Sequence, residues 1–152
     1  MEGDFIEQLR REYLNAVRAG NGRQADKVVE KALSAKFTAG QIYLEIFQPT
    51  GYAIGELWQQ NLISVAQEHL ATAIIEREMG ELHPYFRPKQ MRHKKLVIGC
   101  VDGEHHRVGA RMAADFFEED GWTVHYLGAT VPTSTFISFV HEVGADLIGL
   151  AS

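Results

Sequence analysis

The sequence predicts two parts of different class, an N-terminal four-helix bundle and a flavodoxin/Rossmann-like parallel α/β domain that is incomplete after its third strand. Apolar residues recur at helical spacing from Phe5 to about Leu82. A basic stretch with two prolines, His83 to Lys95, then interrupts the pattern. Beyond it, short apolar runs alternate with helical ones. We therefore place the bundle in residues 1–84 and the α/β domain in residues 95–152.

The first two helices follow from apolar stripes. One stripe runs from Phe5 to Val17 and stops at Gly20-Asn21-Gly22, which is typical of a helix end. The next runs from Ala25 to Leu33. Both are long enough to form an amphipathic helix.

The third and fourth helices each follow a residue that can cap a helix. Thr38 precedes a stripe that reaches Trp58, and Pro49 within this stripe predicts a kink or a break. Ser64 precedes the fourth stripe, with Gln67 at the position that completes a capping box. The first part is thus expected to be four antiparallel helices.

The second part reads as strand, helix, strand, helix, strand. Its five apolar segments are residues 96–101, 108–117, 122–127, 136–143 and 147–150. Fully apolar strands joined by helices predict a parallel sheet, whose ligands bind at the carboxyl ends of the strands. Three strands are fewer than this fold class usually has, so we expect either a longer natural chain or a partner that covers the exposed sheet edge.

Composition excludes several classes of function. A net charge of −5 and a pI near 5.8 give no basic footprint, so we expect no direct binding of nucleic acid. No apolar stretch approaches the ~20 residues that a membrane helix needs. The single cysteine, Cys100, excludes an internal disulfide and is expected to be a buried thiol, which suits the cytoplasm.

The loop after the first strand carries the strongest chemical signal, Asp102-Gly103-Glu104-His105-His106-Arg107. An imidazole that ligates a metal commonly donates its other N–H to a carboxylate, and Glu104 stands two residues before His106. The alternative is a polar loop that caps the helix near Arg107. A closed zinc site is hard to assemble because there is one cysteine and no second His/Cys pair at suitable spacing.

This loop resembles the signature of cobalamin-binding domains. Glu104-x-His106-x-x-Gly109 is similar to their Glu/Asp-x-His-x-x-Gly pattern. The resemblance implies that His106 is the lower axial ligand of the cobalt and that Glu104 hydrogen-bonds to it. It also places His105, Arg107 and Val108 in the cofactor site, with Arg107 a candidate for a phosphate of the nucleotide tail.

A second loop supports the same resemblance. Tyr126 to Pro132 is similar to the Leu-Gly-x-x-x-Pro stretch that these domains place under the corrin ring, which implies contacts from Leu127, Gly128, Thr130 and Val131. Ser152 falls near the Ser-x-Leu element that contacts the nucleotide tail. The leucine of that element and the later Gly-Gly element are not in this sequence.

The helical part narrows the resemblance to CarH-type cobalamin-dependent photoreceptors. Trp58, nine residues and Glu68-His69 match their Trp-x(9)-Glu-His element. An indole offers a flat apolar wall, and an acid–imidazole pair can bind a ribose or an adenine. The alternative is that Trp58 anchors the core and that the helix dipole favours Glu68. Gln59 departs from the family, which has a histidine there as an upper cobalt ligand after illumination.

The leading hypothesis is a non-enzymatic, light-responsive sensor or regulator. It binds cobalamin, with adenosylcobalamin favoured over methylcobalamin and hydroxocobalamin, and the bundle caps the upper face. We expect a homo-oligomer and either a regulatory partner protein or a separate DNA-binding domain. One alternative is a corrinoid protein that carries methyl groups between methyltransferases, and another is an interaction module without cofactor. A radical mutase is not favoured, because these residues form no catalytic barrel for a substrate.

Overall fold

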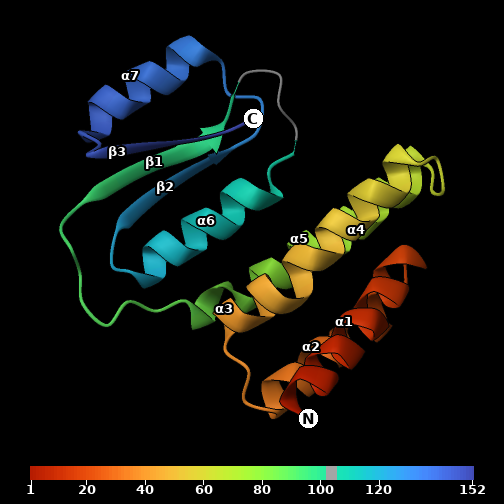
Figure 1. The fold of residues 1–152 in the computed structure, drawn as a ribbon. Helices are drawn as coiled ribbons and strands as arrows, with labels where there is room; N and C mark the ends of the chain where they lie inside the picture. Colours follow the sequence, from red (N-terminus) through yellow and green to blue (C-terminus); the bar gives the residue numbers. More distant parts are fainter. Residues whose placement is uncertain (102–105) are drawn as a thin grey trace. The chain divides into compact units, whose positions relative to one another are not determined.

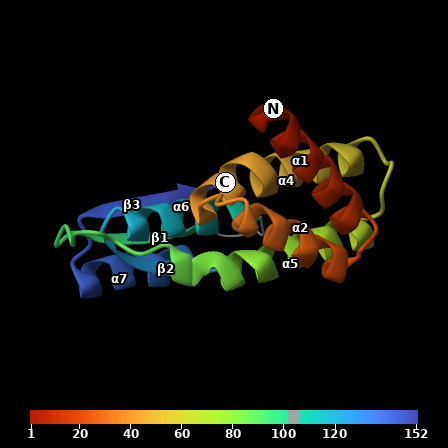
Figure 2. The same cartoon turned by 90° about the horizontal axis from the view of Figure 1, so that it is seen from below.

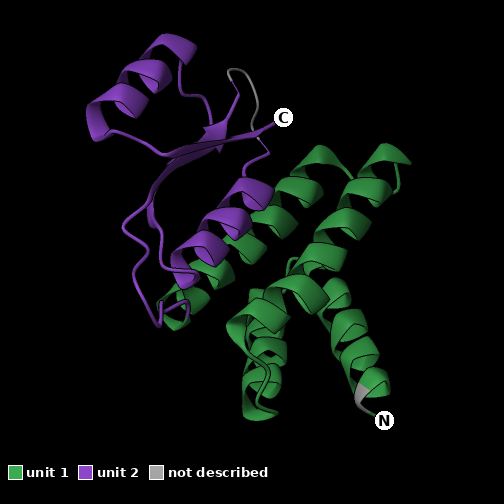
Figure 3. Ribbon diagram, turned by 60° about the vertical axis from the view of Figure 1, so that its left-hand side comes forward, with its two compact units in different colours: residues 1–85 green, residues 86–152 purple. Residues whose placement is uncertain are grey.

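The structure is a computed structural model that describes residues 1–101 and 106–152, apart from the side chain of Glu2. It divides into two compact units, residues 1–85 and residues 86–152 (Figure 3). The first unit is helical and the second contains a three-stranded parallel sheet, so the predicted fold class is confirmed. No helix in these described residues is both long and apolar enough to cross a bilayer.

The helical unit contains the four predicted helices (Figures 1 and 2). Its elements are α1 (Glu2–Arg18), α2 (Gly22–Ser34), α3 (Ala39–Ile42), the π-helical segment η1 (Tyr43–Phe47), α4 (Gln48–Gln59), α5 (Val65–Leu82) and the 3-10 turn η2 (His83–Tyr85). Helix α1 packs against α2, α4 and α5. Their shared core is aromatic at its centre, where Tyr13 and Phe47 stack with ring centroids 5.1 Å apart.

The predicted third helix is continuous through α3, η1 and α4, and Pro49 determines its shape. Pro49 lacks the N–H that would bond to the carbonyl of Glu45 four residues earlier, and the backbone widens into a π-helix at this point. Arg10 of α1 supplies the missing donor, since its Nε lies 2.6 Å from the Glu45 carbonyl oxygen. Its Nη2 also pairs with the Glu45 carboxylate at 2.6 Å. Where we predicted a kink or a break, the helix therefore continues as a π-helical segment in which Arg10 bonds to the Glu45 carbonyl.

Both predicted caps are confirmed. Ser64 accepts a hydrogen bond from the Gln67 N–H, and the Gln67 side chain accepts one from the Ser64 N–H. Thr38 and Gln41 form the same reciprocal pair at the start of α3. These boxes satisfy backbone donors that a helix start leaves unpaired.

The second unit has the strands β1 (Lys95–Cys100), β2 (Thr123–Gly128) and β3 (Leu147–Ala151), with α6 (Val108–Glu119) and α7 (Thr133–Val143) between them. The strand order is β2-β1-β3, and both pairings are parallel. The two helices cover opposite faces of the sheet (Figure 1). Helix α6 packs on the face of Leu96, Ile98 and Cys100, whereas Phe136 of α7 reaches Gly99 on the other face.

The segment between the units is only partly the exposed linker that the sequence predicts. Residues 87–94 are exposed, but Phe86 is buried and meets Phe116 of α6 edge-on, with centroids 5.6 Å apart. Arg92 donates its N–H to the carbonyl of Gly121 in the α6–β2 turn. A Cβ at Gly121, whose φ is +97°, would overlap the Gln90 carbonyl oxygen. This segment therefore belongs to the α/β unit.

Candidate functional site

The carboxyl ends of all three strands lie along one edge of the sheet. Cys100 pairs with Ala151 of β3, and Gly99 pairs with Gly128 of β2. The loops that lead to α6 and α7 start from this edge. The sequence predicted a ligand site here, and the topology brings the two loops together because β1 is flanked by both other strands.

The His106 loop is described from His106 onward; Asp102 to His105 lie outside the described residues, so the predicted Glu104 and His105 contacts have no geometry here. His106 is exposed, and its carbonyl accepts a weak bond from the Cys100 thiol, with Sγ 4.0 Å away. An imidazole on the strand edge is chemically suited to ligate a metal. Its neighbour Glu104 stays a predicted partner.

Contacts from β2 anchor the first turns of α6. Arg107 is the N-cap of α6, and its carbonyl accepts a bond from the Tyr126 hydroxyl at 3.4 Å. The guanidinium of Arg111 stacks over the Tyr126 ring and pairs with buried Asp115. Val108 and Gly109 form the first turn of α6, half-buried and exposed respectively. Tyr126 thus fixes where the His106 loop enters its helix, a role that no sequence motif indicated.

The β2–α7 loop begins with an unusual backbone turn. Gly128 has φ +73° and Thr130 has φ +61°, so the chain turns sharply after Leu127. The β1–β2 register shifts between Ile98 and Gly99, and a Cβ on Gly99 would crowd the Gly128 carbonyl oxygen at 3.2 Å. The absence of a side chain at Gly99 therefore allows the ends of β1 and β2 to approach closely.

The remaining predicted contacts of this loop are accessible. Leu127, Gly128 and Val131 are half-buried, and Thr130 is exposed. Ser152 is also exposed and directly follows β3. A ligand resting on this edge can therefore reach all five positions from outside the core.

In the helical unit, the predicted residues occupy the hairpin between α4 and α5. Trp58 lies in the last turn of α4 and is 39% exposed, so it is not a core anchor. Glu68 and His69 lie in the first turns of α5, with Glu68 Oε2 2.5 Å from His69 Nδ1. Thr72 donates from Oγ1 to the other oxygen of Glu68 at 3.2 Å. The carboxylate is therefore fixed, and it orients the exposed imidazole.

The hairpin also exposes apolar side chains that no sequence motif singled out. Leu62 is 59% exposed and Val65 is 54% exposed. With Trp58, they are exposed apolar side chains at the end of the hairpin. Apolar groups exposed in this way often mark a surface that a ligand or partner covers. Gln59, also exposed, stands next to Trp58.

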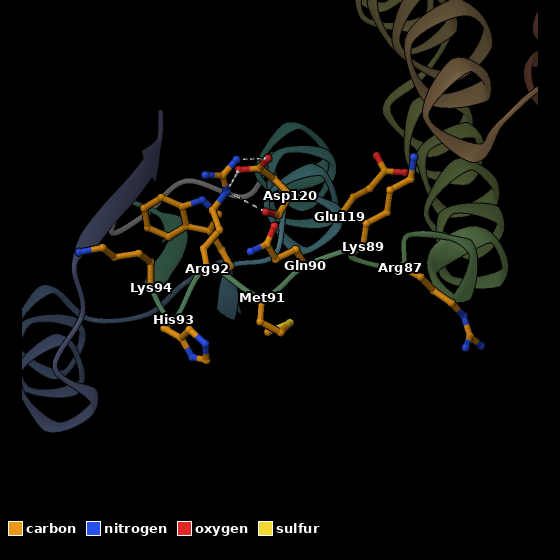
Figure 4. Close-up of a pocket in the computed structure, with 10 residues that line it drawn as sticks. Arg87, Lys89, Gln90, Met91, Arg92, His93, Lys94, Glu119 and Asp120 are labelled. Carbon is orange, nitrogen blue, oxygen red and sulfur yellow. Dashed lines mark hydrogen bonds and ion pairs between the residues drawn. The ribbon is translucent and has the colours of Figure 1, made fainter.

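A further cavity of about 950 Å³ lies at the opposite end of the sheet (Figure 4). It is lined by the basic segment before β1 and by the end of α6, where Arg92 pairs with Asp120 at 2.7 Å. Lys94 and Trp122, which line it, immediately precede the strands. None of the predicted site residues lines this cavity, so its size does not make it the candidate site.

Family comparisons match both units. One family model described as "B12 binding domain" matches residues 9–83, and a second with the same description matches residues 94–152. The HTH-type transcriptional repressor CarH of Myxococcus xanthus is 27% identical over 96% of this chain and 48% of its own length.

Corrinoid proteins are similar as well. Dimethylamine corrinoid protein 2 of Methanosarcina acetivorans is 31% identical over 64% of this chain and 44% of its own length. The chain thus spans about half the length of these two relatives. Among solved structures, the monomethylamine corrinoid protein of Methanosarcina barkeri aligns with TM-score 0.79 at 17% identity over 95% of this chain and 68% of that one. At this identity the alignment shows the fold alone.

Proposed function

Because the chain belongs to the family of B12-binding domains, we propose that it is a cobalamin-binding sensor module and not an enzyme. The α/β unit would bind the corrin over the β2–α7 loop and ligate cobalt through His106. The helical unit would cover the upper ligand. The observation that carries the sensor assignment is the α4–α5 hairpin, where Trp58 is exposed in the last turn of α4 and an oriented Glu68–His69 pair lies in the first turns of α5.

An exposed indole with an adjacent acid–imidazole pair is suited to a bulky ligand that is partly apolar and partly polar. An adenosyl group has this character, whereas a methyl group offers the polar pair nothing to bind. When bound, adenosylcobalamin supplies a cobalt–carbon bond that light can break. Trp58 would pack against the adenosyl group only before illumination, and such a difference in contact is enough to bias two arrangements of the protein.

The test is an absorption spectrum of the purified chain with adenosylcobalamin in the dark and after green light. We expect a protein-bound spectrum that light changes irreversibly. H106A should shift the dark spectrum because the axial ligand is lost, and H141A, an exposed histidine on α7, serves as its control. W58A should weaken retention of adenosylcobalamin more than that of methylcobalamin, with Y52A on the same helix unchanged. Equal retention of both cofactors by W58A would contradict the cap.

The second candidate is a methyl-carrying corrinoid protein. The 31% identity to a dimethylamine corrinoid protein favours it, and the two functions share one fold. Selective retention of methylcobalamin, together with methyl transfer when a methyltransferase is added, would establish this function instead.

Signal output is a separate part of the proposal. We expect a homo-oligomer in the cytoplasm whose assembly state responds to light and is read by a regulatory partner or a separate DNA-binding domain. Light scattering on size-exclusion fractions, in the dark and after illumination, measures this directly. An unchanged mass in both states would remove the assembly mechanism while leaving cofactor binding untouched.

A further inference from the structure

A small cavity between α2 and α5 contains a buried carboxyl group that the proposed function does not use. The cavity measures about 200 Å³ and is lined by acidic residues and by apolar ones. The acidic residues are Asp26, Glu30, Glu78 and Glu81, and the apolar ones are Val29, Leu33, Leu82 and Tyr85.

Glu78 is unusual because it is 1% exposed and half satisfied. Tyr13 of α1 donates its hydroxyl to Oε2, whereas Oε1 accepts no hydrogen bond, and a protonated Glu78 can share its proton with the Asp26 carboxylate. A buried polar atom without a partner destabilises the fold. Burial, with the nearby Asp26 carboxylate, raises the pKa of Glu78 to about 8. The unpartnered oxygen and the acidic lining both suit a positively charged donor.

The other groups around Glu78 leave the cavity acidic. Arg77 is the cation on this side, and it pairs with Asp26 at 2.5 Å and with Glu81 at 4.0 Å. Glu30 adds a further negative charge from α2. Counting Arg77, the carboxylates outnumber the cations even when Glu78 is protonated.

We propose that this cavity binds a short alkylammonium ion, with the ammonium donating to Glu78 Oε1 and the alkyl chain packing on Leu33 and Leu82. A divalent metal ion fits less well. It needs at least three converging ligands, and among the described residues these acids do not form a group of three ligand atoms within 4.8 Å. The volume, below the ~300 Å³ of drug-sized sites, restricts the ligand to a few heavy atoms.

The ion replaces a proton on Glu78, which fixes the pH dependence. A carboxylate whose pKa is about 8 is roughly one-tenth ionised at pH 7 and nine-tenths ionised at pH 9, while the alkylammonium ion stays charged. Affinity should therefore rise about tenfold over this range. The charged and titratable groups around Glu78 are Tyr13, Asp26, Glu30, Arg77, Glu81 and Tyr85. Burial holds the pKa of Tyr13 well above 10, so its hydroxyl stays a donor to Glu78 over this range.

The experiment titrates n-propylammonium chloride into the chain and follows backbone amide shifts by NMR at pH 7 and pH 9. Shifts confined to residues 26–33 and 78–85, with millimolar affinity that is tighter at pH 9, are expected. n-Propanol, the neutral analogue, should not bind. E78Q should weaken binding at least tenfold at pH 9 and abolish the pH dependence, and E56Q, an equal charge change on α4, should not.

A second variant separates loss of the site from loss of the fold. L33W fills the cavity from its half-buried wall and leaves Glu78 in place, so it should abolish binding while circular dichroism stays unchanged. Absence of shifts at 50 mM ligand, or equal binding by E78Q at pH 9, would show that the cavity holds only a proton. Cobalamin binding is read by absorption and is independent of either result.

Discussion

The two units present the residues that we propose to bind the ligand in different ways. In the helical unit, these residues are Trp58 and the Glu68–His69 pair, whose side chains project from two consecutive regular helices. In the α/β unit, the backbone largely positions these residues, because the loop after β2 turns through positive φ at Gly128 and Thr130. A substitution at a helical position lowers stability only locally, whereas a position where two backbone segments approach closely tolerates few side chains. Each unit contains one tryptophan, Trp58 in the helical unit and Trp122 in the α/β unit. Tryptophan fluorescence of W58F protein therefore reports the α/β unit alone, and that of W122F protein reports the helical unit alone.

The largest expected effect tests the backbone contacts of the α/β unit. G121A should destabilise this unit by about 3 kcal/mol or more, because the added Cβ meets the Gln90 carbonyl and the residue is held at φ +97°. Urea unfolding followed by Trp122 fluorescence in W58F protein measures the loss.

The matched control is G144A. Gly144 also has positive φ, but a Cβ added there would meet nothing within 4 Å, so only about 1 kcal/mol should be lost. Equal losses in the two variants would mean that strain alone, and not the contact with Gln90, holds the segment before β1.

The next effect concerns the helical unit and pH. Because the pKa of Glu78 is about 8 when folded and near 4.5 when exposed, the folded state holds more protons between these values. Stability from this group is complete below pH 4.5 and is lost as pH rises through 8, by roughly 2–4 kcal/mol. E78Q should flatten that part of the stability profile. Thermal unfolding from pH 5 to pH 9 measures it, and E81Q, which should keep the wild-type slope, is the control.

A smaller effect concerns the π segment. R10M removes the donor to the Glu45 carbonyl and should cost about 1–3 kcal/mol, whereas R11M on the exposed side should cost little. Proline is the cause, so P49A, which restores an N–H, should reduce the cost of R10M. Urea unfolding of the four-variant cycle, read at 222 nm, gives the coupling. Strict additivity would contradict this explanation of η1.

The smallest effect tests a cap. S64A leaves the Gln67 N–H without its acceptor and should lower stability by about 1 kcal/mol. S138A on α7, whose hydroxyl donates to a carbonyl one turn earlier, should change stability less. A loss larger than that of R10M would reverse the order that we assign to local and long-range contacts in the bundle.

The same contrast explains what the sequence can predict. Helical stripes, both caps and the order of helices and strands are local patterns, and they located the α-helices and strands of the described residues to within a few residues, but not the 3-10 turn η2. The repair of Pro49 by Arg10 joins residues far apart in the sequence, and no periodicity signals it. Phe86 was misassigned to an exposed linker because its partner Phe116 lies thirty positions later. For the proposed site, motif spacing predicts Trp58, Glu68 and His106, and their ligand-binding roles stay a prediction. The contact of Tyr126 with Arg107 could not be predicted in this way, because it depends on strand register.

The central place of β1 has a consequence for how the chain folds during synthesis. Helices α1 to α5 pack on one another within residues 1–85, so the bundle can form once residue 85 has left the ribosome. The first strand cannot, because both of its partners come later: β2 ends at Gly128 and β3 at Ala151. Until then its apolar row, Leu96 to Cys100, has no sheet to join. The N-terminal unit can therefore fold before β1, the strand that leads to His106, has its partner strands. We expect formation of the α/β unit to limit the folding rate of the chain.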